Sequence, residues 1–243
     1  MSTPKITIIQ AENRPTLDYF LLSKDVNSRA AAQLGYTYKF LLIDEKYTKK
    51  YHPATCKIFT LRDYLKTSTD DAIIFLDSDA WIQSCTIVKT VVTHLIASPK
   101  KHGCFSRDTY IKDCSFVNSG SFILKVNHYT QNMLVIFSNY IYNKLHNFDC
   151  NNWPWDQYYY DYYILQNTHY FYIYKPNVLN TPNGIGFRHN WTKKQQMYDD
   201  LNALLDTSYI EKETIFNIDE SLDDRPYPNT DPIPDGFPYC LSN

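Results

Sequence analysis

Two aspartates end a strongly apolar stretch of the sequence. Residues 73–82 read IIFLDSDAWI, so Asp77 and Asp79 follow an apolar run directly and are separated by one serine. A buried carboxylate is costly unless a counter-charge lies beside it, and a divalent cation can supply that charge. Carboxylate oxygens favour Mg²⁺ or Mn²⁺, which commonly also bind the oxygens of a substrate diphosphate. The pair therefore predicts a metal site, whereas the alternative is a turn that the aspartates merely cap.

Three later segments carry polar residues that could complete such a site. FVNSGSFIL places Asn118 and Gly120 between apolar runs, where a glycine allows close approach of the backbone to a ligand or forms a plain bulge. WPWDQ places Asp156 and Gln157 behind two tryptophans that could stack on a sugar ring, although Asp156 could equally cap a helix. TPNGIGFRHNWTKK reads as a flexible loop rich in phosphate-binding groups, with His189 as a candidate metal ligand or a structural histidine.

Alternating strands and helices surround these segments. Strands are predicted at 5–10, 36–44, 71–79, 104–106, 115–126 and 170–176, and helices at 17–35, 55–68, 86–97, 128–145 and 153–166. Gly35 is the expected C-cap of its helix, and Gly120 is expected to break its strand. The unbroken apolar run before Asp77 is typical of a strand covered on both faces. This pattern predicts an open α/β sheet, whose ligands bind beyond the C-terminal ends of the strands.

Composition restricts the class of protein. A net charge of −2 without a basic run gives no support to a nucleic-acid partner or an anionic membrane surface. The six cysteines form no CxxC pair, no signal peptide is visible and no apolar run could span a membrane, so a soluble cytoplasmic protein is expected. One domain is predicted over residues 1–218. The proline-rich residues 219–243 are interpreted as a tail, or as a linker to a further domain.

Taken in order, the motifs resemble those of the nucleotide-diphospho-sugar glycosyltransferases of GT-A fold. The resemblance is strongest to the GMA12/MNN10 family of galactosyl- and xylosyltransferases, and small glycosyltransferases of large algal viruses look similar too. The matching segments are CKIFTLRDYL, IIFLDSDAWI, FVNSGSFIL, WPWDQ and GIGFRHN. The resemblance implies an α/β, Rossmann-like fold with a mixed, mainly parallel sheet flanked by helices. It also implies a metal-dependent transferase that moves a sugar from a nucleotide-diphosphate donor, with UDP preferred, to a hydroxyl of a glycan or glycoprotein.

The roles of individual residues follow from this resemblance as expectations. Mn²⁺ or Mg²⁺ would be bound by Asp79 and His189, with Asp77 contacting the metal, a metal-bound water or the ribose. The other donor-binding candidates are Ala11, Asn13 and Arg14 after the first strand, together with Lys57, Ser78, Asn118, Gly120, Arg188 and Lys193. Asp156 and Gln157 are the catalytic candidates. Asp156 would be the base of an inverting enzyme, or either residue would stabilise the reacting face of a retaining one.

Two departures from the family pattern affect these expectations. Eukaryotic members usually carry an N-terminal membrane anchor, which is not visible here, and the sequence reads Trp-Asp-Gln where Trp-Glu-Gln is commoner. The alternatives are a glycogenin-like retaining transferase, a non-catalytic carbohydrate-binding protein, and a nucleotidyl- or phosphoryl-transfer enzyme. No glycine-rich phosphate loop follows the first strand, which argues against the last of these.

Overall fold

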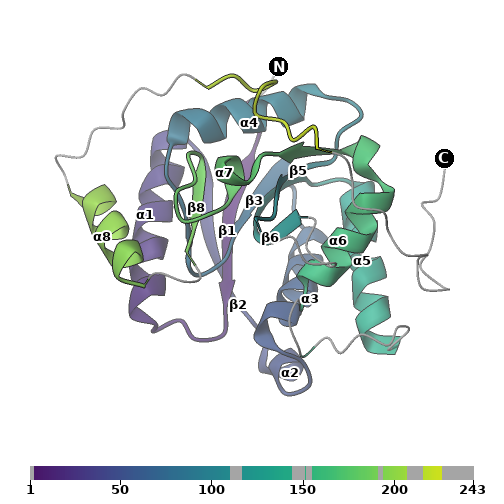
Figure 1. Cartoon of the computed structure of the whole chain (residues 1–243). Helices are drawn as coiled ribbons and strands as arrows, with labels where there is room; N and C mark the ends of the chain where they lie inside the picture. Colours follow the sequence, from purple (N-terminus) through teal and green to yellow (C-terminus); the bar gives the residue numbers. More distant parts are fainter. Residues whose placement is uncertain are drawn as a thin grey trace.

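A mixed sheet forms the centre of the computed structural model, which describes residues 3–109, 117–143, 151, 155–190, 194–206 and 216–225 (Figure 1). Its strand order is β2-β1-β3-β6-β5-β7. The strands are β1 (Ile6–Glu12), β2 (Thr37–Leu42), β3 (Ala72–Leu76), β5 (Gly103–Arg107), β6 (Val117–Lys125) and β7 (Phe171–Tyr174). β6 is antiparallel to both β3 and β5, and the other pairings are parallel. The predicted mixed, mainly parallel sheet is therefore confirmed.

Helices cover both faces of this sheet (Figure 1). One face packs against α1 (Asp18–Leu34), α4 (Cys85–Ala97) and α7 (Pro176–Leu179), and the other against α3 (Pro53–Leu65), α5 (His128–Asn143) and α6 (Gln157–Gln166). Alternate residues of β3 enter the two cores: Ile74 faces α1 and α4, whereas Phe75 faces α3 and α5. All of β3 is fully buried, as its unbroken apolar run predicts.

Local signals explain several element boundaries. α1 ends at Gly35, which adopts the left-handed conformation at φ 72° and is the C-cap that the sequence predicts. α3 begins with proline at its first position, after the short α2 (Glu45–Thr48). The Ser84 hydroxyl caps α4 by accepting a hydrogen bond from the Ile87 N–H. η1 (Thr168–Tyr170) connects α6 to β7, and α8 (Lys194–Leu205) packs against α1.

β6 continues through Gly120, so the glycine does not end the strand. The pairing of β6 with β5 is nevertheless irregular between Phe105 and Arg107, opposite the stretch that contains Gly120, in keeping with the bulge that the sequence left open. One expectation for the backbone is wrong. The segment expected as a flexible loop contains β8 (Phe187–His189), which pairs antiparallel with β4 (Ala80–Ile82) and brings His189 opposite Ala80. Neither short strand has enough residues to show the alternation that identifies a strand in a sequence.

The segment that follows the predicted domain lies against the main sheet where it is described. Leu222 forms an antiparallel bridge with Tyr174 of β7, and the Asp223 N–H donates to the Ile173 carbonyl. Residues 226–243 of the expected tail lie outside the described residues, and the boundary after residue 218 stays a prediction. No helix in the described part of the chain is long and apolar enough to cross a membrane.

Candidate active site

Asp77 and Asp79 lie in the connection between β3 and β4, at the C-terminal edge of the main sheet. The alternation of β3 continues into this connection, so Asp77 lies on the same face as Phe75 and reaches Lys57 of α3. The side chains of Asp77 and Asp79 are 21% and 26% exposed, so both carboxylates remain accessible from solvent. The strand therefore holds two acids at the sheet edge where open α/β folds bind ligands.

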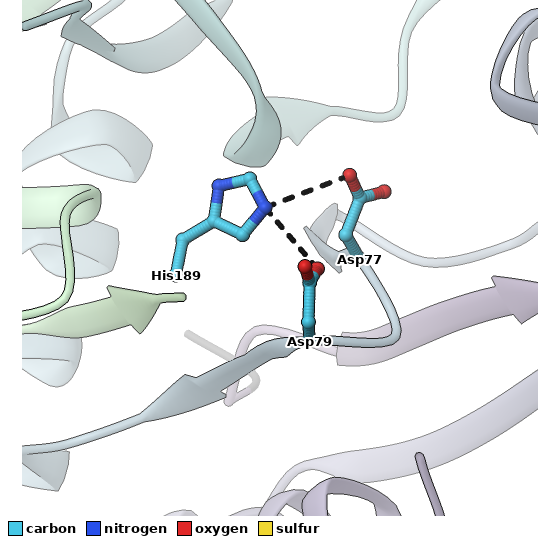
Figure 2. Close-up of side chains that lie close together, drawn as sticks. All are labelled: Asp77, Asp79 and His189. Atoms are coloured by element: carbon cyan, nitrogen blue, oxygen red, sulfur yellow. Dashed lines mark ion pairs between the residues drawn. The ribbon is translucent and has the colours of Figure 1, made fainter. Parts of the chain in front are cut away.

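His189 of β8 completes a cluster of candidate metal ligands. Its Nε2 lies 3.2 Å from Asp79 Oδ1 and 3.9 Å from Asp77 Oδ2, and Figure 2 shows the three side chains converging. One ligand atom from each residue lies within 4.8 Å of the other two. Two carboxylates and one imidazole are suitable ligands for Mn²⁺. Asp79 is closest to the histidine, as expected of a ligand, while one oxygen of Asp77 is already bound by Lys57 at 2.7 Å.

The hydrogen bonds of Asn118 determine which nitrogen of His189 faces the aspartates. Asn118 Oδ1 accepts a hydrogen bond from the backbone N–H of Gly120 at 2.8 Å, so this atom must be the oxygen. His189 Nδ1 lies 3.2 Å from this oxygen and 3.2 Å from Asn180 Oδ1, so it carries the proton and donates. In the neutral ring, Nε2 therefore keeps its lone pair for a metal, which is the arrangement expected behind a metal-binding histidine.

Gly120 has no side chain, and the imidazole of His189 occupies the space that a side chain would fill. A Cβ built on Gly120 would lie 2.1 Å from Cε1 and 2.5 Å from Nδ1 of the ring, far inside van der Waals contact. The expectation that Gly120 brings the backbone close to the donor stays a prediction. In this structure the group that lies against the glycine is the histidine ring.

A Gly120→Ala variant is therefore expected to bind Mn²⁺ roughly tenfold or more weakly, because the methyl group must displace His189. Isothermal titration of Mn²⁺ measures this change. Gly35→Ala is the matched control, because its added Cβ meets nothing within 4 Å and only its positive φ makes it destabilising, by about 1 kcal/mol. Equal Mn²⁺ affinity in the Gly120→Ala and wild-type proteins would contradict the assignment of His189 as a ligand.

Lys57 connects the aspartate pair to Asp156. Its Nζ lies 2.7 Å from Asp77 Oδ1 and 3.3 Å from Asp156 Oδ2, and all three side chains are largely buried. Burial disfavours the charged lysine, but Asp156 and Asp77 outweigh this effect and raise the pKa of Lys57. Burial also raises the pKa of Asp156 to about 6, although Lys57 opposes the shift. Asp156 makes no capping hydrogen bond to α6, so the capping alternative is wrong.

Replacing Lys57 with methionine is expected to lower the free energy of unfolding by about 3 kcal/mol, because two buried carboxylates lose their shared counter-charge. Urea denaturation measures the change. Lys89→Met on the exposed face of α4 is the control and should change stability by less than about 0.5 kcal/mol. A loss below about 1 kcal/mol for Lys57→Met would show that Lys57 does not compensate the two acids.

A cavity of about 350 Å³ opens beside these groups. It brings together seven of the residues proposed from the sequence: Ala11, Asn13, Arg14, Lys57, Asp77, Ser78 and Asp79. Trp155, one of the two tryptophans expected to stack on a sugar ring, lines it as well. The sequence interpretation missed six others that line it: Glu12, Tyr19, Ile43, His52, Pro53 and Ala54. Glu12 lies between the predicted residues Ala11 and Asn13, and that adjacency was the signal that could have found it. The other five lie near the start of α1, after β2 or at the start of α3, and adjoin no predicted site residue.

His52 and Trp155 form one wall of the cavity although they are distant in the sequence. Their rings stack with centroids 4.7 Å apart and planes 8° from parallel. Trp155 has a positive φ of 52°, which is uncommon for a non-glycine residue and often marks a functional site. A stacked pair of flat rings is a suitable surface for a sugar or a base.

The other seven predicted residues are not among the described residues that line this cavity. Four of them belong to the contacts described above: Asn118, Gly120, Asp156 and His189. The remaining three lie apart from these contacts or outside the described residues. Arg188 forms an ion pair with Asp200 of α8 at 2.7 Å and does not line the cavity. Gln157 Nε2 donates to Asp108 Oδ2 at 2.8 Å, a buried partner that the sequence interpretation missed. Lys193 lies outside the described residues.

A mixed Rossmann-like sheet with an Asp-x-Asp pair at its C-terminal edge, opposed by a late histidine, defines the GT-A class of fold that the sequence resemblance implied. Comparison with solved structures supports this class. No protein-family model matches the chain, and no curated protein matches it in sequence. Its place in the GMA12/MNN10 family therefore stays a prediction.

Several solved structures that resemble this chain are glycosyltransferases. One is a glycosyltransferase involved in the glycosylation of the major capsid of PBCV-1, with 14% identity over 82% of this chain and 100% of that chain and a TM-score of 0.64. The galactosyltransferase LgtC, solved with donor and acceptor sugar analogues, has 9% identity over 84% and 98% of the two chains and a TM-score of 0.52. The apo form of GlyE from Streptococcus pneumoniae TIGR4 has 12% identity over 88% and 67% and a TM-score of 0.51. These likenesses establish the fold.

Proposed function

We propose that this protein is a metal-dependent glycosyltransferase that moves a sugar from a nucleotide-diphosphate donor, with UDP as the first candidate, to a hydroxyl of a glycan or glycoprotein. The observation that carries the proposal is the cluster of Asp77, Asp79 and His189 beside a cavity at the C-terminal edge of a GT-A sheet. Several structures that this chain resembles are glycosyltransferases, which supports the same class of reaction.

The cavity offers separate groups for the parts of such a donor. Ala11 near the end of β1, and Asn13 and Arg14 directly after it, are proposed to bind the nucleoside. The buried Oδ1 of Asn13 has no hydrogen-bond partner, so it is free to accept from a base N–H or a ribose hydroxyl. The diphosphate is proposed to lie near Asp79 and His189. Bound Mn²⁺ or Mg²⁺ there would neutralise the charge that develops on the leaving diphosphate.

Asp156 and Gln157 are the proposed catalytic residues for the transfer itself. With its pKa at about 6, Asp156 is mainly ionised at pH 7 and could accept a proton from the acceptor hydroxyl. This would give inversion at the anomeric carbon. In a retaining reaction, as in a glycogenin-like enzyme, Asp156 or Gln157 would instead stabilise positive charge on the reacting sugar. Both routes are compatible with the structure.

A screen of nucleotide sugars tests the proposed function. The protein is incubated with each UDP- and GDP-sugar, with Mn²⁺ or with EDTA, and release of nucleoside diphosphate is measured together with thermal stability. One donor should raise the melting temperature and be cleaved only when Mn²⁺ is present. Glycan binding without cleavage of any donor would instead support the carbohydrate-binding alternative.

A further inference from the structure

Three buried polar side chains lie behind the turn that carries the two aspartates. Gln10 comes from β1, whereas Ser23 and Asn27 come from one face of α1, four residues apart. All three are 0% exposed. Burying so many polar atoms beside an apolar core is costly unless each finds a partner.

The partners of these side chains are backbone carbonyls of the aspartate turn. Gln10 Nε2 donates to the Asp77 carbonyl at 3.0 Å, and the Ser23 hydroxyl donates to the Ser78 carbonyl at 2.7 Å. Asn27 Nδ2 donates to the Ala80 carbonyl at 3.0 Å. The remaining carbonyl of the turn, that of Asp79, accepts from the Asn190 N–H at 3.1 Å. All four successive carbonyls are therefore bonded to the protein interior or to the segment after β8.

The orientation of each amide in this network is determined by its partners. Gln10 Nε2 faces carbonyl oxygens, which can only accept, so its Oε1 must face Tyr38, whose hydroxyl donates at 2.9 Å. Asn27 Nδ2 faces a carbonyl, while its Oδ1 accepts from the Ile82 N–H at 2.9 Å. Each amide is thus satisfied in one orientation, and the Ser23 hydroxyl has its shorter contact to the turn, at 2.7 Å against 3.1 Å to the Phe20 carbonyl. A satisfied buried network rigidifies the backbone that it contacts.

We propose that Gln10, Ser23 and Asn27 are positioning residues of the metal site, which act on metal affinity through the backbone of residues 77–80. They bind the carbonyls on one side of the turn, so the carboxylates of Asp77 and Asp79 project from the other side toward His189. The two like charges repel each other before a cation binds, and a loosely held turn would relax by separating them. The inference rests on the metal site of the proposed function.

A matched pair of serine variants tests this inference. Ser23→Ala removes a buried hydroxyl that bonds the aspartate turn, whereas Ser138→Ala removes a buried hydroxyl that bonds only the Leu134 carbonyl within α5. Gln10→Leu is the stronger change at the turn. Mn²⁺ affinity is measured without donor, by titration calorimetry and by the electron paramagnetic resonance signal of free Mn²⁺, and the melting temperature is recorded for each protein.

Mn²⁺ affinity is expected to fall roughly tenfold for Gln10→Leu and severalfold for Ser23→Ala, as it does when other groups that orient metal ligands are removed. For Ser138→Ala the expected change in Mn²⁺ affinity is less than about twofold. If Ser23→Ala and Ser138→Ala lose similar thermal stability and keep wild-type Mn²⁺ affinity, the network is only structural and the inference is wrong. Ser23→Ala removes one atom, so the test does not depend on Gln10→Leu folding. A wild-type protein that binds no Mn²⁺ would overturn the metal-dependent function as well.

Discussion

An Asp79→Asn variant is expected to bind Mn²⁺ too weakly to support sugar transfer, with kcat/KM reduced by about 10³ or more. Asp79 Oδ1 lies closest to the imidazole nitrogen that faces the site, so it is the oxygen best placed to share a metal with His189. Asparagine keeps the size of the side chain but removes the charge. Since electrostatic stabilisation of the leaving group is expected to dominate catalysis, the loss falls on the reaction as well as on binding.

The measurements for Asp79→Asn are Mn²⁺ titration and donor cleavage at several Mn²⁺ concentrations. Asp25→Asn, on the exposed face of α1, is a control for the loss of one aspartate charge and should leave both values unchanged. Metal-dependent donor binding that is as strong in Asp79→Asn as in the wild type would exclude Asp79 as a ligand.

An Asp156→Asn variant should lose about 10²–10⁴ in kcat if Asp156 is the general base, while Mn²⁺ binding changes little. The side chain is buried and paired with Lys57, and its pKa of about 6 places it near the range where a base is effective. Asparagine is nearly isosteric and cannot take up the acceptor proton. Single-turnover transfer at saturating donor and Mn²⁺ separates this step from binding.

The outcome for Asp156→Asn also distinguishes the two stereochemical routes. Transfer that survives within about tenfold would make a general base at this position untenable. A Gln157→Leu variant measured in parallel shows whether the neighbouring amide contributes instead. Because Gln157 also bonds Asp108, its melting temperature must be recorded, so that a loss of stability is not taken for a loss of catalysis.

The main sheet and the aspartate pair could be predicted because their signals are local. The apolar run of β3 identifies a strand buried on both faces, and the two acids directly after it are placed at its C-terminal end by chain continuity alone. The glycine cap of α1 is equally local. Residues adjacent to these strand ends, such as Asn13 and Ser78, therefore lie in the cavity as proposed.

The parts of the site that depend on contacts between distant segments were not predictable in this way. His52 and Trp155 stack although they are about a hundred residues apart, and nothing in either local sequence encodes the other. The ion pair between Lys57 and Asp156 depends on α3 and the start of α6 meeting on one face of the sheet. Arg188 was assigned to the donor because it is a cation near His189, but strand alternation directs it to Asp200 instead.

The pairing of β8 with β4 has a consequence for what kind of charge occupies the site. Arg188 and His189 are consecutive, and a shift of one residue in the pairing would exchange which of them faces the aspartates. In the observed register, the acids face an imidazole, whose Nε2 can bind an ion taken from solution once this nitrogen has lost its proton. In the shifted register they would face a guanidinium that the chain itself supplies and that never dissociates. The three residue pairs between β4 and β8 thus decide which side chain faces the two aspartates. With histidine there, the site can exchange its cation with solution, whereas with arginine the cation would be part of the chain.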